Sequence, residues 1–295
     1  MKEDFNFGSR DAAIRTQTYS IVRRLKGLPH ALFALYWRDV HGPLCSRLPG
    51  LGFYVQHHFS TERTARLWPV GDGVRHFGIE LDGAVEIGFS TVDEAARFIE
   101  SSPILFGDEV NVFGWDAAYS LPNGSRTFVD QDPDGLPNGV DRLYRLHVYF
   151  SEHPNGRLGP WLTEFATQLS AQPEVVKLRL HLPEPFDNAH PQPPSPVPHD
   201  VIDDLLRIGV MEIGFASALD ARRLFESDVF ACAAASQATH VQAVAAVLVT
   251  HVYTFVRDGK PTMAGLRGSS VAEVIASIGA TNHASEQVQR MFVHA

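Results

Sequence analysis

The chain has 295 residues, a formal net charge of −9 and a hydrophobic fraction of 44%, which is enough for about two domains of ordinary size. The acidic balance argues against binding to duplex nucleic acid or to an anionic membrane, since both need a basic face. Cys45 and Cys232 are the only cysteines, so neither a disulfide framework nor a structural zinc site is expected. The first twenty residues lack the apolar core of a secretory signal, and no apolar run reaches the roughly 20 residues of a membrane span. We therefore expect a cytoplasmic protein.

The first half of the chain alternates strand and helix patterns. Strands are expected over residues 19–26, 51–60, 85–89 and 111–115, and helices over residues 30–48 and from about 91 through 99. Their order is βαββαβ, which is the order of the ferredoxin-like unit.

A segment rich in turn-forming residues, 121–141, joins this half to the rest and is expected to be a linker. Its acidic residues match positions 1, 3, 5, 6 and 12 of a calcium loop: Asp130, Asp132, Asp134, Gly135 and Asp141. Two prolines and the lack of a flanking helix favour a solvated acidic linker. Calcium binding is the alternative.

The second half repeats the element order of the first. Strands are expected over residues 142–150, 175–182, 209–215 and 250–257, and helices over residues 158–170 and 219–227. The segment VEIGFSTVDEAARFIESS returns 126 positions later as MEIGFASALDARRLFESD, so that Glu86 corresponds to Glu212. We expect an α+β protein of two tandem ferredoxin-like domains, 15–120 and 142–268, with a helical extension over 269–295. Because such a unit has helices on one face only, the two open sheet faces should pack together.

A histidine interrupts the apolar stripe of the first predicted helix. The stripe consists of residues four apart, which share one slowly drifting face: Phe33, Trp37, His41 and Cys45. The next strand alternates between two faces; one holds Phe53, Val55 and His57, and the other holds Tyr54 and His58. If Phe53 packs under the helix, His57 reaches the space beside His41, where two imidazoles form an acid/base pair. Which of His57 and His58 faces this pocket stays open.

Comparison of the two halves favours chemistry in the first. At an offset of 128, Trp37 corresponds to Phe165 and His41 to Leu169, so the stripe persists while its histidine is lost. Glu86 recurs in both halves and is expected to serve the fold. His57 is a weaker case, because it aligns with His181 at an offset of 124.

The segment LKGLPHALFALYWRDVHGPLCSRLPGLGFYVQHH, residues 25–58, resembles the signature of the EthD family of dimeric α+β barrel proteins. The motif parts are Trp37, His41-Gly42-Pro43, Leu48-Pro49-Gly50-Leu51 and Tyr54-Val55-Gln56-His57-His58, with Asp108-Glu109 farther on. The second half lacks these motifs. The resemblance implies a dimeric α+β barrel supplied by one chain. It also implies relatives that are cofactor-free lyases or isomerases, accessory proteins, haem proteins and oxygenases.

Our leading hypothesis from the sequence is a cofactor-independent lyase or isomerase that acts on a small cyclic or aromatic carbonyl or polyketide-like compound. His41 would transfer the proton, His57 or His58 would be the partner acid, and Tyr54 would orient the substrate. The expected substrate-binding residues are Phe33, Trp37, Cys45 and Phe53. No metal or other cofactor is expected, and the partners would be a hydrophobic small molecule and a second copy of the chain. The alternatives are a non-catalytic binding protein and a haem-dependent or cofactor-free oxygenase.

Overall fold

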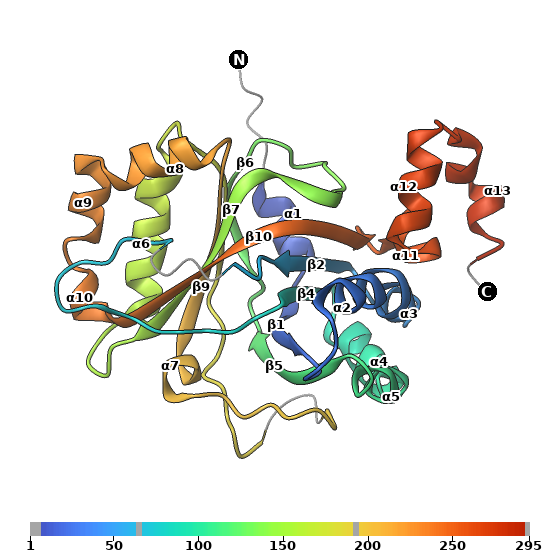
Figure 1. Ribbon diagram of the computed structural model, residues 1–295, viewed down its shortest axis with the longest axis horizontal. Coiled ribbons are helices and arrows are strands. Elements are labelled where there is room, and N and C mark those ends of the chain that lie inside the picture. Colours follow the sequence, from blue (N-terminus) through green and yellow to red (C-terminus); the bar gives the residue numbers. More distant parts are fainter. Residues whose placement is uncertain (1–6, 63–66, 191–194, 293–295) are drawn as a thin grey trace.

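The computed structural model describes residues 7–62, 67–190 and 195–292; the last three residues of the predicted helical extension, 293–295, lie outside these ranges. Within them, nine strands form one continuous curled sheet in the order β5-β1-β4-β2-β10-β7-β9-β8-β6 (Figure 1). Two short strands, β3 (Arg75–His76) and β11 (Lys260–Pro261), add to β10. No helix in the described ranges is long and apolar enough to cross a membrane.

The first half forms a ferredoxin-like unit with strand order β5-β1-β4-β2. Its strands are β1 (Thr16–Arg24), β2 (Phe53–Phe59), β4 (Gly83–Phe89) and β5 (Phe113–Leu121), and its helices are α2 (His30–Tyr36), the π-helical turn η1 (Trp37–His41), α3 (Gly42–Ser46), α4 (Val92–Ser101) and α5 (Pro103–Glu109). The start of α4 follows from a capping box, in which Thr91 Oγ1 accepts from the Glu94 amide and the Glu94 carboxylate accepts from the Thr91 amide. The fourth strand is longer than the predicted 111–115.

The second half has the equivalent strand order β10-β7-β9-β8. Its strands are β7 (Asn138–Glu152), β8 (Val175–His181), β9 (Ile208–Phe215) and β10 (Val241–Arg257), and its helices are α6 (Leu158–Ser170), α7 (Asp203–Leu206), α8 (Ala218–Phe225), α9 (Asp228–Ala234) and α10 (Gln237–His240). The last strand begins at Val241 rather than near residue 250.

The remaining elements flank these units: α1 (Phe7–Ala13), β6 (Arg126–Asp130), α11 (Met263–Arg267), α12 (Ser269–Ser277), the 3-10 turn η2 (Thr281–Ala284) and α13 (Glu286–Gln289). Strand β6 lies in the segment predicted as a linker and pairs with β8. The carboxylates of the calcium-like pattern bind separate cations, since Asp130 pairs with Lys177 and Asp141 with Arg145. They therefore do not converge on one ion.

The two four-stranded sheets join edge to edge where β2 pairs with β10, and they curl into a barrel. The chain after β8 runs beside β5, where the Glu184 amide donates to Ser120 O at 2.9 Å and the Asp116 amide donates to Pro198 O at 3.0 Å. The longer helices of each half cover the outer face of the sheet, whereas Leu205 of the short helix α7 packs in the inner core. The inner face encloses a core drawn from both halves, which includes Ile21, Phe59, Ala117, Val210 and Val249.

Candidate functional site

Strand β2 presents its two neighbouring histidines to opposite faces of the sheet. Tyr54 and His58 belong to the outer, helix-covered side, where the His58 ring stacks on Trp37 with centroids 4.4 Å apart. Val55 packs in the inner core, and His57 lies on its face, 4.6 Å from the ring of an inner-face histidine on β7. The predicted pairing of His57 with His41 is therefore wrong, because a strand shifted by one residue exchanges its faces.

His41 instead forms a dyad with an acidic residue of α5. Its Nδ1 lies 2.9 Å from Asp108 Oδ2, and Tyr36 donates its hydroxyl to the other carboxylate oxygen. The hydrogen bond from His41 is the main cause that lowers the pKa of Asp108. The His41 ring is buried and meets Phe113 edge to face. This dyad is an acid/base arrangement on the outer side of the sheet.

The other predicted site residues divide between the two sides. Phe33, Trp37, Cys45 and Tyr54 are almost fully buried in the outer core. Burial raises the pKa of the Cys45 thiol, and Tyr54 receives a hydrogen bond of 2.7 Å from the Gln56 side chain. Of the predicted substrate-binding residues, only Phe53 lines a cavity on the inner side, in whose wall His57 also lies. These residues thus do not form one substrate wall.

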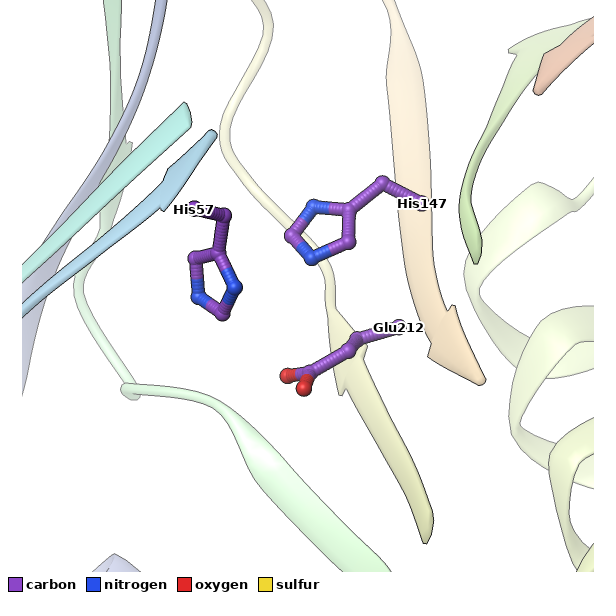
Figure 2. Close-up of side chains that lie close together, drawn as sticks. All are labelled: His57, His147 and Glu212. Atoms are coloured by element: carbon purple, nitrogen blue, oxygen red, sulfur yellow. The ribbon is translucent and has the colours of Figure 1, made fainter. Parts of the chain in front are cut away.

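The inner face carries a cluster of polar side chains from both halves, all of them buried except Arg179, whose side chain is 15% exposed. We call the following residues the central cluster: Tyr19 of β1, His57 of β2, Glu86 of β4, Arg145 and His147 of β7, Arg179 and His181 of β8, and Glu212 of β9. The alternation of β7 explains part of it, because Arg145 and His147 share a face with Tyr149. Figure 2 shows His57, His147 and Glu212 with their side chains pointing toward one another.

Each histidine of the central cluster uses one ring nitrogen and leaves the other without a protein partner. His57 Nε2 lies 3.2 Å from Glu86 Oε1, and His147 Nδ1 lies 2.7 Å from the Tyr19 hydroxyl. His181 Nδ1 lies 2.7 Å from the Ser125 hydroxyl. Within the described residues, the second nitrogens of all three rings are buried and unpartnered. Such groups cost free energy unless something binds them.

The electrostatics of the central cluster separate two neutral rings, His147 and His181, from two charged carboxylates. Burial lowers the pKa of His147 well below its usual value and that of His181 to about 4. Burial alone would raise the pKa of Glu86, but the Arg179 charge and the neighbouring histidines hold it well below its usual range. Glu212 behaves in the same way, with Lys177 and Arg145 as the opposing cations. The cluster thus offers imidazole lone pairs beside carboxylate anions.

A cavity of about 1050 Å³ opens beside the central cluster. His57, Glu86, Arg145, Arg179 and Glu212 all lie in its wall. A molecule of drug-like size fits such a volume. The cluster is therefore both buried and adjacent to space for a substrate.

Strand register shows that both copies of the internal repeat contribute residues to the central cluster. Glu86 stands opposite Tyr19 and Val55, whereas Glu212 stands opposite His147 and Arg179. His57 and His181 each lie two residues beyond Val55 and Arg179, so they occupy equivalent positions. Sequence reasoning identified His57 but missed its partners. The spacing of Arg145, His147 and Tyr149 along one strand is the signal that could have revealed them.

Two overlapping sets in the described residues could hold a metal ion. The ligand atoms of His57, His147 and Glu212 lie within 4.8 Å of one another, and the same is true of Glu86, His181 and Glu212. Imidazole and carboxylate donors of this kind suit divalent transition metals.

No protein-family model matches the chain, and no curated protein matches it significantly. Solved structures do. A protein from Fusobacterium nucleatum subsp. nucleatum, provisionally named a monooxygenase, matches over 85% of this chain and 98% of its own, with a TM-score of 0.50 and 5% identity.

Two further structures are similar at lower TM-scores. One from Lactobacillus acidophilus NCFM, also provisionally named a monooxygenase, covers 81% of this chain and 95% of its own, with a TM-score of 0.45 and 9% identity. An anthrone oxidase-like protein covers 82% and 94%, with a TM-score of 0.49 and 8% identity. At 5% identity, the match to the Fusobacterium structure shows the fold alone, which is two ferredoxin-like units joined into one curled sheet.

Proposed function

We propose that the protein is an oxygenase that converts a small cyclic or aromatic carbonyl compound inside the barrel cavity. The observation that carries the proposal is the convergence of three buried histidines and two ionised carboxylates beside a cavity of about 1050 Å³. His57 and Glu212 belong both to the central cluster and to the cavity wall. A bound molecule would meet the reaction centre through these two residues.

Recognition of the substrate is assigned to an aromatic ring flanked by two arginines. Phe53 lines the cavity, with the guanidinium carbons of Arg179 and Arg257 at 5.4 and 5.6 Å from its ring centre. Within the described residues, Arg257 forms no ion pair; it donates to two backbone carbonyls and leaves its buried Nε unpartnered. An enolate oxygen on a deprotonated substrate would be stabilised by these fixed cations.

The proposed reaction balances without a separate reductant. An activated CH₂ group of the substrate becomes a carbonyl, one atom of O₂ enters the product, and the other leaves as water with the two hydrogens. All electrons come from the substrate. A fold neighbour that is provisionally named a monooxygenase supports this class of reaction. Membership of the EthD family remains part of the proposal.

The test is oxygen consumption with a panel of cyclic and aromatic carbonyl compounds. We expect at least one compound to be consumed together with an equal amount of O₂, and ¹⁸O₂ to place one labelled atom in the product. Binding of panel compounds without oxygen uptake or product would contradict the proposal and favour an accessory binding role. A Soret band in the purified protein would favour a haem-dependent oxygenase.

The His41–Asp108 dyad supports a second candidate, the cofactor-independent lyase or isomerase. A histidine oriented by a carboxylate at 2.9 Å can move a proton next to a carbonyl group. In that case His41→Ala should abolish turnover, and turnover should proceed without oxygen. Full activity of His41→Ala would exclude this candidate.

A further inference from the structure

We propose that His57, His147 and Glu212 bind one divalent transition-metal ion inside the barrel. The inference rests on the proposed function only for its catalytic consequence, since the ion can be detected without a substrate.

The first argument is the direction of the unpartnered nitrogens. His57 Nδ1 and His147 Nε2 are buried and have no protein partner in the described part of the chain. The two rings lie 4.6 Å apart between centroids, and the ligand atoms of the three residues fall within 4.8 Å of one another. Metal–ligand distances of roughly 2.0–2.2 Å place donors about 3–4 Å apart, so a small movement closes the three side chains around an ion.

The second argument is the set of groups that hold these rings from behind. His57 Nε2 faces Glu86, and His147 Nδ1 faces the Tyr19 hydroxyl, which in turn lies 2.9 Å from the Tyr149 hydroxyl. Histidines that bind a metal usually donate their other ring N–H to such a partner, which fixes the tautomer and turns the free lone pair toward the ion. Both rings have this arrangement.

The third argument is charge. Ion pairs join five carboxylates to three cations around the site: Arg145 with Asp141 and Glu212, Arg179 with Glu86 and Asp11, and Lys177 with Asp130. The cavity wall as a whole also has more carboxylates than cations, with eight Asp and Glu residues against six Arg and Lys residues. A divalent cation would offset this surplus of negative charge in a buried place.

Glu212 can serve the ion while it keeps its arginine. Its Oε1 accepts from Arg145 at 2.7 Å, but a carboxylate has two oxygens with about four acceptor sites. The competing set of Glu86, His181 and Glu212 is weaker, because Glu86 already accepts from the Gln17 amide at 2.7 Å and faces both Arg179 and His57.

The donor set indicates which metal suits the site. Two histidines and one carboxylate leave coordination positions open, and His57 and Glu212 turn toward the cavity. This donor set is typical of iron(II) oxygenases that lack haem. We therefore infer iron(II) as the native ion and use cobalt(II) as a spectroscopic probe.

The experiment is calorimetric titration of the chelator-treated full-length chain with Fe(II), without oxygen, and with Co(II). We expect one ion per chain, with visible Co(II) bands that indicate nitrogen ligation. His147→Gln and Glu212→Gln should lose this binding. The matched control is His58→Gln, which changes an equally buried histidine next to His57 on the opposite sheet face and should bind one ion as the wild type does.

A milder variant separates loss of metal binding from loss of the fold. Tyr19→Phe removes only the hydroxyl behind His147 and should weaken binding by about 10-fold to 100-fold, while circular dichroism checks that the fold is kept. Absence of binding in the wild type, which would mean that water occupies the site, overturns the inference. Unchanged binding in His147→Gln, or loss in His181→Gln alone, overturns the assigned ligands.

The outcomes also separate this inference from the proposed function. A chain that binds one ion but consumes no oxygen with any panel compound would retain the metal site and contradict the oxygenase. A metal-free chain that oxygenates a substrate would support the oxygenase and contradict the metal site.

Discussion

The two faces of strand β2 each hold one buried histidine, and the surroundings of the two histidines differ. On the outer face, the His58 Nε2 lies 3.1 Å from the Gln56 side chain and the ring is enclosed by Trp37 and Tyr253. On the inner face, His57 keeps a buried nitrogen without a partner and borders a cavity. The outer histidine is fixed by packing. The inner histidine has a ring nitrogen that is free to bind a ligand. Both histidines are buried, so burial alone does not identify a site.

Separate replacement of each of these neighbouring histidines by glutamine is the strongest test of the difference between the two faces. We expect His57→Gln to lower the rate of oxygen uptake by about 100-fold or more, because the central cluster loses a donor that faces the cavity. His58→Gln should stay within a few-fold of the wild type. Equal losses in the two variants would show that the faces do not differ in function.

Removal of an aromatic side chain tests whether the outer face is packing. Trp37 is about 1% exposed and contacts Phe33, His58 and Phe113, so Trp37→Ala should lower the free energy of unfolding by about 3–5 kcal/mol. Denaturant unfolding measures this. Metal binding at the inner face should remain at one ion per chain, and its loss would indicate that the two faces are coupled.

The third prediction concerns the carboxyl group of Asp116 on β5 and its effect on the pH dependence of stability. Burial, with the Glu109 charge as a second cause, raises the pKa of Asp116 on β5 from 3.8 to about 8. Because the folded state holds this proton more tightly than the unfolded state, stability should fall as pH rises from about 4 to about 8. Asp116 is partly exposed, so we expect Asp116→Asn to gain only about 2 kcal/mol at pH 8. It should gain nothing at pH 4, and a gain of equal size at both pH values would refute this assignment.

The last prediction concerns the reactivity of the two cysteine thiols. Cys45 is buried in the outer core and its pKa is raised, whereas Cys232 is exposed. Iodoacetamide at pH 8 should therefore modify Cys232 and leave Cys45 intact in the folded protein, as peptide mass analysis can show. Rapid labelling of Cys45 would mean that the outer face contains a reactive pocket.

The sequence was sufficient for the architecture because the repeat carries long-range information. The match of Glu86 to Glu212, with the same element order around each, predicts two equivalent units from the sequence alone. The start of the last strand was missed because residues 241–249 are nearly all apolar, and such a run lacks the alternation that distinguishes a strand from a helix.

The candidate site was harder to predict, for a physical reason. Both faces of β2 are buried, so its pattern has no polar side to orient it, and the sequence left open which of His57 and His58 faces His41. The central cluster also draws on strands from both halves, and the sequence does not show which strands meet. The comparison of halves attributed the repeated Glu86 and Glu212 to the fold, but both carboxylates lie in the central cluster, and Glu212 is a ligand of the proposed metal site.

The most direct test is the anomalous X-ray scattering of cobalt in crystals loaded with Co(II). We predict a single ordered peak per chain inside the barrel, within bonding distance of His57, His147 and Glu212. A peak beside His41 and Asp108 on the outer face, or no ordered peak in the barrel, would contradict the placement of the reaction centre at a metal ion in the central cluster.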